Sequence, residues 1–326
     1  MKMFTFDPAE HRAAYAEQGY VHIREGITPE FHAYLLSYVE KELNAHLLDD
    51  YAIAGKKEQA LFDFPDAEES QAELFDAISS MCGLVRERMV LSERHIQAYE
   101  PNANPEPHAH KDRYPSQVSV GLSITIPSES RLVLYPSDQR EINPFNKAAD
   151  YNRYLQPEDK PENTLPAARE VELADTDRDV VIFPGSTTWH LRRRAARSVN
   201  VYFKMNDFGC DPLGEDLTTA GVRAATVAAL SSPGVDALVP VVSRRLDSVA
   251  RVATRNDWQE VLLAKVYGEE PVGVTELQYA VLRDLGAEVP LAEVAEKLAG
   301  PDRSAAEVRA AILRLAEIGA VDLLQA

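Results

Sequence analysis

The stretch DVVIFPGSTTWHLRRRAARSVNVYFKM, residues 179–205, decides the fold of this chain. Its short runs are apolar or alternate between apolar and polar residues, as β-strands do. Gly, Pro and Asp divide these runs, as they divide strands joined by turns. The same pattern recurs between residues 94 and 208, in HIQAYE, QVSVGLSITIP, RLVLYP and REVEL. Six short strands in about 115 residues indicate an antiparallel barrel or sandwich rather than a βαβ sheet.

Helical patterns precede and interrupt the strands. Residues 7–48 predict a helix, a short strand and a second helix, with Asp7 and Thr28 as N-caps, each followed by proline. Residues 71–92 predict a further amphipathic helix. The polar segment 143–166 is too long for a hairpin turn, and inserts of that length often serve as lids or binding loops.

The C-terminal third returns to helical spacing. Residues 212–270 are predicted to be helical, for example in VDALVPVVSRRLDSVARVA. Residues 271–326 predict three helices and a terminal strand, which resemble a winged-helix module. We therefore expect three parts: a strand-rich domain with N-terminal helices (1–210), a helical segment (211–270) and a winged-helix-like module (271–326).

Composition restricts the functional classes. The 326 residues carry a formal net charge of −18, which disfavours binding to nucleic acid or to an anionic membrane. In residues 271–326 acidic residues outnumber basic ones nine to five, so the tail predicts packing or homodimer formation rather than DNA binding. Two cysteines build no disulfide framework, and the sequence has neither a signal-peptide core nor a membrane-length apolar run. We expect a cytoplasmic protein.

The segment EPHAHKDRY, residues 106–114, is the strongest chemical signal. Side chains two apart on a strand share a face, so His110 and Asp112 could bind one metal ion. His190, at the end of an apolar strand, is the candidate third ligand. Two imidazoles and one carboxylate are the donor set of non-haem Fe(II) oxygenases. His108 has the same spacing to His110, and we favour Asp112 because a carboxylate completes the iron pattern.

Arg197 is the candidate anchor for an anionic cosubstrate. Alternation along RSVNVYFK puts Arg197 on the same face as Val199, Val201 and Phe203, and we expect this apolar face to point into the barrel. A buried guanidinium needs an anion, and we favour a dicarboxylate cosubstrate over the alternative, a carboxylate of the protein itself. A shift of one residue in the strand register would place Arg197 outside. Arg192, Arg193 and Arg194 are interpreted as a solvated turn, with a basic rim for anionic substrates as the alternative.

These motifs resemble the Fe(II)/2-oxoglutarate-dependent dioxygenases with a double-stranded β-helix (jelly-roll or cupin) core. The phytanoyl-CoA dioxygenase-like group is nearest, because its N-terminal helix–strand–helix and its H-x-D…H…R order are similar to residues 5–208. The resemblance implies that Fe(II), 2-oxoglutarate and O2 are used, with His110, Asp112 and His190 as iron ligands. It implies Arg197, Ser198, Gln97 and Tyr99 as cosubstrate contacts.

The reaction implied is hydroxylation of an unactivated C–H bond of a small molecule, such as an amino-acid-like or natural-product intermediate, while 2-oxoglutarate is decarboxylated to succinate. A second resemblance, to JmjC/cupin-type hydroxylases, implies a protein substrate and Arg131 as the anchor. It also fits the helical and winged-helix-like tail. The rival outside enzymes is a cupin-like metal-binding or regulatory protein without catalysis.

Overall fold

Two antiparallel β-sheets organise Met1–Gly209, the first of two compact units into which the chain divides. The computed structural model describes residues 1–43, 57–136, 141–145, 148–253, 258–286 and 288–324. In this first unit the larger sheet has the strand order β1-β7-β4-β9-β3-β2 and the smaller has β6-β5-β8. The strands are β1 (Val21–Ile23), β2 (Lys57–Leu61), β3 (Val90–Tyr99), β4 (Val118–Thr125), β5 (Arg131–Tyr135), β6 (Val171–Leu173), β7 (Val180–Phe183), β8 (Trp189–Arg193) and β9 (Val199–Asn206).

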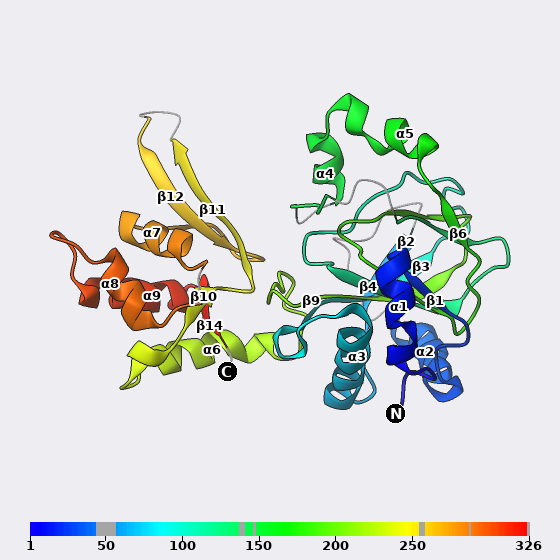
Figure 1. The fold of residues 1–326 in the computed structure, drawn as a ribbon, viewed down its shortest axis with the longest axis horizontal. Coiled ribbons are helices and arrows are strands. Elements are labelled where there is room, and N and C mark those ends of the chain that lie inside the picture. Colours follow the sequence, from blue (N-terminus) through cyan, green and yellow to red (C-terminus); the bar gives the residue numbers. More distant parts are fainter. Residues whose placement is uncertain (44–56, 137–140, 146–147, 254–257, 287, 325–326) are drawn as a thin grey trace. The chain divides into compact units, whose positions relative to one another are not determined.

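Helices cover the outer faces of both sheets. Figure 1 shows α1 to α3 on the side of the larger sheet and the α4–α5 segment at the opposite end of the unit. The helices are α1 (Pro8–Gln18), α2 (Pro29–Glu42), α3 (Ala67–Cys82), α4 (Ala148–Tyr154) and α5 (Pro161–Thr164). Short 3-10 turns lie at Arg86–Arg88, Pro157–Asp159 and Leu165–Ala167. The mainly β arrangement of antiparallel sheets with flanking helices confirms the predicted fold class at that level.

The N-terminal helices begin where the sequence predicts. The side chain of Asp7 accepts a hydrogen bond from the N–H of Ala9, and that of Thr28 accepts one from the N–H of Phe31. The predicted helix at 71–92 ends earlier, at Cys82. Gly83 follows it with φ 77°, a left-handed conformation that ends helices and suits glycine.

The larger sheet is buried on both faces, and this feature determines what lines the interior. Val201 and Phe203 of β9 belong to the same apolar cluster as Phe31 of α2, on the outer, helix-covered face. Tyr202, between them, instead joins Leu134 of the smaller sheet in a separate cluster. The apolar side chains of β9 therefore pack against helices, and its polar side chains face the space between the sheets.

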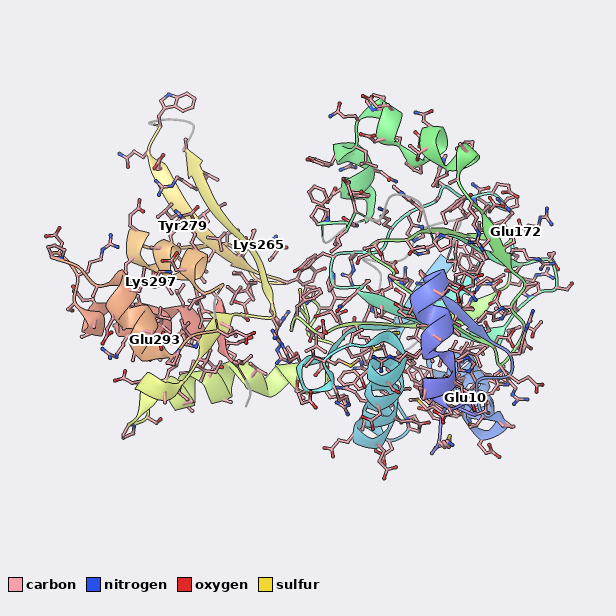
Figure 2. The ribbon with its side chains drawn as sticks, viewed as in Figure 1. Glu10, Glu172, Lys265, Tyr279, Glu293 and Lys297 are labelled. Atoms are coloured by element: carbon pink, nitrogen blue, oxygen red, sulfur yellow. The ribbon has the colours of Figure 1, made fainter. Side chains whose placement is uncertain are left out.

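The insert at 143–166 is a helical cover in its described parts. Tyr151 of α4 lies 5.7 Å from the ring of Trp189 on β8. Both residues are buried in a cluster on the outer face of the smaller sheet. Glu172 of β6 also lies on the outside of this unit (Figure 2) and forms an ion pair with Arg193.

Cys210–Ala326 forms the second compact unit, with its own core of buried aliphatic residues from α7, α8 and α9. Its elements are α6 (Thr219–Leu230), a 3-10 turn (Val235–Ala237), β10 (Pro240–Val242), β11 (Leu246–Ala253), β12 (Glu260–Val266), β13 (Val272–Gly273), α7 (Glu276–Asp284), α8 (Leu291–Leu298), α9 (Ala305–Glu317) and β14 (Val321–Leu323). Strands β10 and β14 pair, and β11-β12-β13 form a second sheet.

The expected three helices and terminal strand are present after residue 271, and capping boxes at Thr275 and Ser304 begin α7 and α9. The prediction of helix through VDALVPVVSRRLDSVARVA was wrong. Most of this stretch forms β10 and β11, because β14 and β12 supply antiparallel backbone partners for these two strands. The guanidinium of Arg251 on β11 lies 5.5 Å from the centre of the ring of Tyr279 on α7.

Among the described residues, every helix is too short or too polar to serve as a membrane span.

Candidate metal centre

His110 and His190 are brought together by the backbone. The segment before β4 pairs with β8 at these two residues, and each N–H donates to the carbonyl of the other at 2.9 Å. The two imidazole rings lie 4.4 Å apart between centroids. A short bridge between distant parts of the chain therefore sets the spacing of the two histidines.

The side chains of His110, Asp112 and His190 converge, with one ligand atom from each lying within 4.8 Å of the others. His190 Nε2 is 3.7 Å from Asp112 Oδ1. His190 Nδ1 donates to the carbonyl of Thr188 at 2.9 Å, which selects the tautomer whose Nε2 carries the lone pair. Two imidazoles and one carboxylate on one side of a site fit Fe(II) and leave positions for other ligands.

Asp112 is fixed by contacts to both its backbone and its side chain. Its N–H donates to the carbonyl of Gly185 at 2.9 Å, and Asn143 Nδ2 donates to its carbonyl at 2.8 Å. Ser119 Oγ donates to Oδ2 at 2.8 Å, and Lys204 Nζ donates to Oδ1 at 2.8 Å. The carboxylate is thus held in one orientation before any ligand is considered.

Burial opposes the ionisation of Asp112, but the charges of Lys204, His190 and His110 outweigh it and hold the pKa of Asp112 far below its usual range. Burial likewise opposes the ionisation of Glu93, and Arg113 and Lys204 outweigh it, so the pKa of Glu93 is also strongly lowered. Both carboxylates are therefore charged at neutral pH.

Gly185 permits the close approach of chain segments at Asp112. A Cβ at this position would lie 2.1 Å from Ser119 Oγ and 2.5 Å from Asp112 Oδ2. Any side chain here would displace the carboxylate. The sequence displays this glycine in FPGS, but only the structure reveals what it faces.

His108 lies elsewhere. It is exposed and lines a hollow of about 300 Å³ with Tyr135, Leu191 and Arg193, on the outer face of the smaller sheet. The geometry therefore favours Asp112 over His108 as the partner of His110, as the iron pattern suggested.

The expectation that Arg197 faces the interior was wrong. Arg197 is exposed, precedes β9 in a turn with φ 65°, and its N–H donates to the carbonyl of Tyr99 at 3.1 Å. The error was to assign the apolar face of β9 to the barrel interior. That face packs against the N-terminal helices, so the alternate, more polar residues of β9 face the interior.

The other candidate cosubstrate residues are divided between the two faces. Ser198 is buried, with its Oγ 3.2 Å from Ser130 Oγ. Gln97 is the cross-strand partner of Asn200, which places both on the interior face, and Tyr99 follows Gln97 on that face. Arg131 lies on the outer face, where its guanidinium donates to the carbonyls of neighbouring residues at 2.6 Å.

Arg192 is the interior arginine that the sequence did not identify. Its guanidinium makes two hydrogen bonds with Asp175, at 3.0 and 2.8 Å, and both side chains are almost fully buried. The interpretation of residues 192–194 as a solvated turn was therefore wrong for Arg192. It was also wrong for Arg193, which pairs with Glu106 and with other acidic residues. The sequence could have indicated this position, because Arg192 lies two residues after His190 on one strand and side chains two apart share a face.

Comparisons with known proteins add likeness at the level of structure. No protein-family model and no curated protein matches the sequence. The chain is similar to the non-heme alpha-ketoglutarate-dependent carbocyclase SnoK from nogalamycin biosynthesis, with 17% identity, a TM-score of 0.46, and coverage of 60% of this chain and 83% of that one. It is similar to iron-bound EctD from S. alaskensis, with 14% identity, a TM-score of 0.44, and coverage of 63% and 79%. It is also similar to a prolyl-4-hydroxylase from Pseudomonas putida, with 13% identity, a TM-score of 0.39, and coverage of 61% and 98%. At these values the likeness carries no functional argument, and the function rests on the residues of the site.

Proposed function

We propose that this chain is an Fe(II)/2-oxoglutarate-dependent oxygenase with a double-stranded β-helix core, which hydroxylates an unactivated C–H bond of a small molecule. The convergence of His110, Asp112 and His190 within 4.8 Å carries the proposal. With iron(II), 2-oxoglutarate and O2 bound, such a site oxidises the C–H bond while 2-oxoglutarate is decarboxylated to succinate and CO2. An amino-acid-like or natural-product intermediate is the proposed substrate class.

The protein's own part is to hold and orient these groups. His110, Asp112 and His190 would supply the metal ligands, and the hydrogen bond from His190 to Thr188 would fix the ring that ligates. Ser119 would keep one carboxylate oxygen of Asp112 turned away from the metal.

The interior cation Arg192 replaces Arg197 and Arg131 as the proposed anchor of the distal carboxylate of 2-oxoglutarate. Burial raises the pKa of the Tyr202 phenol, and the charge of Arg192 and its hydrogen bond to Tyr202 oppose this rise. Arg192 also donates to Ser130 Oγ, which lies 3.2 Å from Ser198 Oγ. Arg192, on β8, therefore faces the stretch of β9 that runs from Ser198 to Tyr202. Asn200 lies between these two residues, on the same face of the strand.

Unpaired polar atoms in this region support a ligand site. Both amide atoms of Asn200 and the Nε of Arg192 are buried and have no hydrogen-bond partner among the described residues. Such atoms cost about 1–3 kcal/mol each when left unpaired, so groups of this kind are normally satisfied. A carboxylate bound here would accept from Nε and from the Asn200 amide. Gln97 and Tyr99 remain proposed contacts from the neighbouring strand.

The test is anaerobic titration of the purified full chain with Fe(II) and 2-oxoglutarate, followed by the weak visible charge-transfer band. We expect a band in the wild type, none in His110→Ala, and weaker 2-oxoglutarate binding in Arg192→Met. Arg197→Ala is the matched control and should bind as the wild type does, because Arg197 is exposed.

Absence of the band would contradict the proposal. A band without succinate formation in air, across candidate small molecules, would favour the non-catalytic binding protein. A JmjC-like protein hydroxylase is the weaker alternative, because its expected anchor Arg131 lies on the outer face.

A further inference from the structure

A buried lysine already occupies the metal-facing side of the carboxylate ligand. Lys204 Nζ lies 2.8 Å from Asp112 Oδ1 and 2.9 Å from Glu93 Oε1. All three side chains are less than 10% exposed. Lys204 reaches this position because it lies on the inward face of β9, directly opposite Glu93 on β3 and Ser119 on β4.

The oxygen that binds Lys204 is also the one that faces the histidines. Oδ1 of Asp112 lies 3.7 Å from His190 Nε2, while Oδ2 is taken by Ser119. A divalent cation bound through Oδ1 would therefore lie close to the ammonium of Lys204. Like charges this close repel strongly in a buried site, where water screens them little.

Glu93 offers Lys204 a second place. Glu93 pairs with Lys204 through Oε1 and with Arg113 through Oε2. Together with Asp112, the cluster holds two carboxylates and two cations, so its charges balance without a metal. A metal ion adds two positive charges to this balance, and the ammonium can reduce the conflict by moving toward Glu93.

We propose that Lys204 is a positioning residue that holds Asp112 in the absence of metal and gives up its hydrogen bond to Oδ1, keeping the one to Glu93, when a divalent ion binds. Lys204 thereby lowers the affinity of the site for metal, and Glu93 restores part of that affinity. The inference rests on the metal-binding part of the proposed function.

The test measures Mn(II) binding to the full chain by calorimetry and by the loss of the free Mn(II) signal in electron paramagnetic resonance. Lys204→Met should bind Mn(II) more tightly than the wild type, by about tenfold or more, because the repelling charge is gone. Glu93→Gln should bind Mn(II) more weakly. Lys204 then loses its ion pair with Glu93 and keeps the one with Asp112, so its charge stays beside the metal ligand. Lys204→Gln keeps a hydrogen-bond donor without the charge and serves if the methionine variant does not fold.

Opposite signs in the two variants distinguish this role from a structural one. Both substitutions also disturb the packing and hydrogen bonds of the cluster, so a merely structural role would weaken Mn(II) binding in both. Mn(II) affinity that is unchanged or lower in Lys204→Met and Lys204→Gln would overturn the inference and leave the metal site standing. No Mn(II) binding by the wild type would overturn both.

Discussion

Replacing Gly185 with alanine would insert a methyl group at the hydrogen bond that holds the carboxylate of Asp112. The added Cβ would lie 2.1 Å from Ser119 Oγ, 2.5 Å from Asp112 Oδ2 and 3.2 Å from the carbonyl of Ser116. Ser119 Oγ donates to that same Oδ2 at 2.8 Å. The methyl group therefore collides with both partners of one bond.

The size of the effect follows from these distances. Bringing both contacts to 3.0 Å requires Ser119 Oγ to retreat by about 0.9 Å and Asp112 Oδ2 by about 0.5 Å. A metal site works only while its ligands stay within about 0.5 Å of their positions. We expect Mn(II) affinity to fall about 10- to 100-fold. Overpacking of this buried site should also lower the free energy of unfolding by about 1–3 kcal/mol.

The assay is calorimetric titration of Mn(II) together with urea unfolding of the metal-free protein. Gly185→Ala combined with Ser119→Ala should recover part of the affinity, because the closest collision disappears while the contact with Asp112 remains. Gly221→Ala on α6 is the matched control. Nothing lies within 4 Å of its added Cβ, so this variant should bind Mn(II) normally.

Wild-type Mn(II) affinity in Gly185→Ala would refute the reasoning. If the effects of Gly185→Ala and Ser119→Ala on Mn(II) affinity simply added, the collision between the new methyl group and Ser119 Oγ would not be the cause of the loss.

Two further substitutions address the surroundings of the site. Asp175→Asn leaves Arg192 buried without its anion and should lower the free energy of unfolding by about 3–5 kcal/mol at neutral pH. Burial opposes ionisation of Asp175, but Arg192 outweighs it and lowers its pKa, so this stabilisation exists above the unfolded pKa of about 3.9 and is lost as pH falls through the folded value. Urea unfolding of both proteins should show the difference shrinking below about pH 4, and a constant difference to pH 2 would contradict the pairing. Lys111→Met removes an ammonium that donates to the carbonyl of Glu141 at 2.7 Å and lies over the rings of Tyr151 and Trp189. Amide exchange in α4 should become about tenfold faster, and unchanged exchange would show that Lys111 does not hold the insert in place.

The metal triad could be predicted from sequence because its signals are local. The spacing of His110 and Asp112 is a property of one short segment, although the structure has that segment as a single bridge residue followed by a loop and not as a strand, and His190 follows an apolar run with turn residues. The same holds for α1 and α2, whose caps and prolines are adjacent in the sequence. None of these features depends on which distant segment packs nearby.

The interior of the sandwich could not be predicted in the same way. Alternation along β9 divides its residues into two sets, but it does not say which set faces the other sheet. The amphipathic helices α2 and α3 require an apolar surface, and their buried residues share one cluster with the apolar side of β9. This assignment exchanges Arg197 for Asn200 and Lys204 as interior residues. The sequence did contain a hint: the predicted N-terminal helices need an apolar surface to pack on, and the apolar face of β9 provides one.

Strand β9 is buried on both faces, and each face has a different neighbour: the helices on one side and the smaller sheet on the other. Val201 and Phe203 pack in the cluster that includes the helices, whereas Asn200 and Lys204 place an amide and an ammonium between the sheets. Substitutions at the polar positions therefore leave the helix-facing contacts of Val201 and Phe203 in place, but they change the hydrogen bonds and ion pairs between the sheets. Alternate residues of one strand are thus under separate constraints: one set is held by its contacts with the helices, and the other by the charged and polar side chains between the sheets.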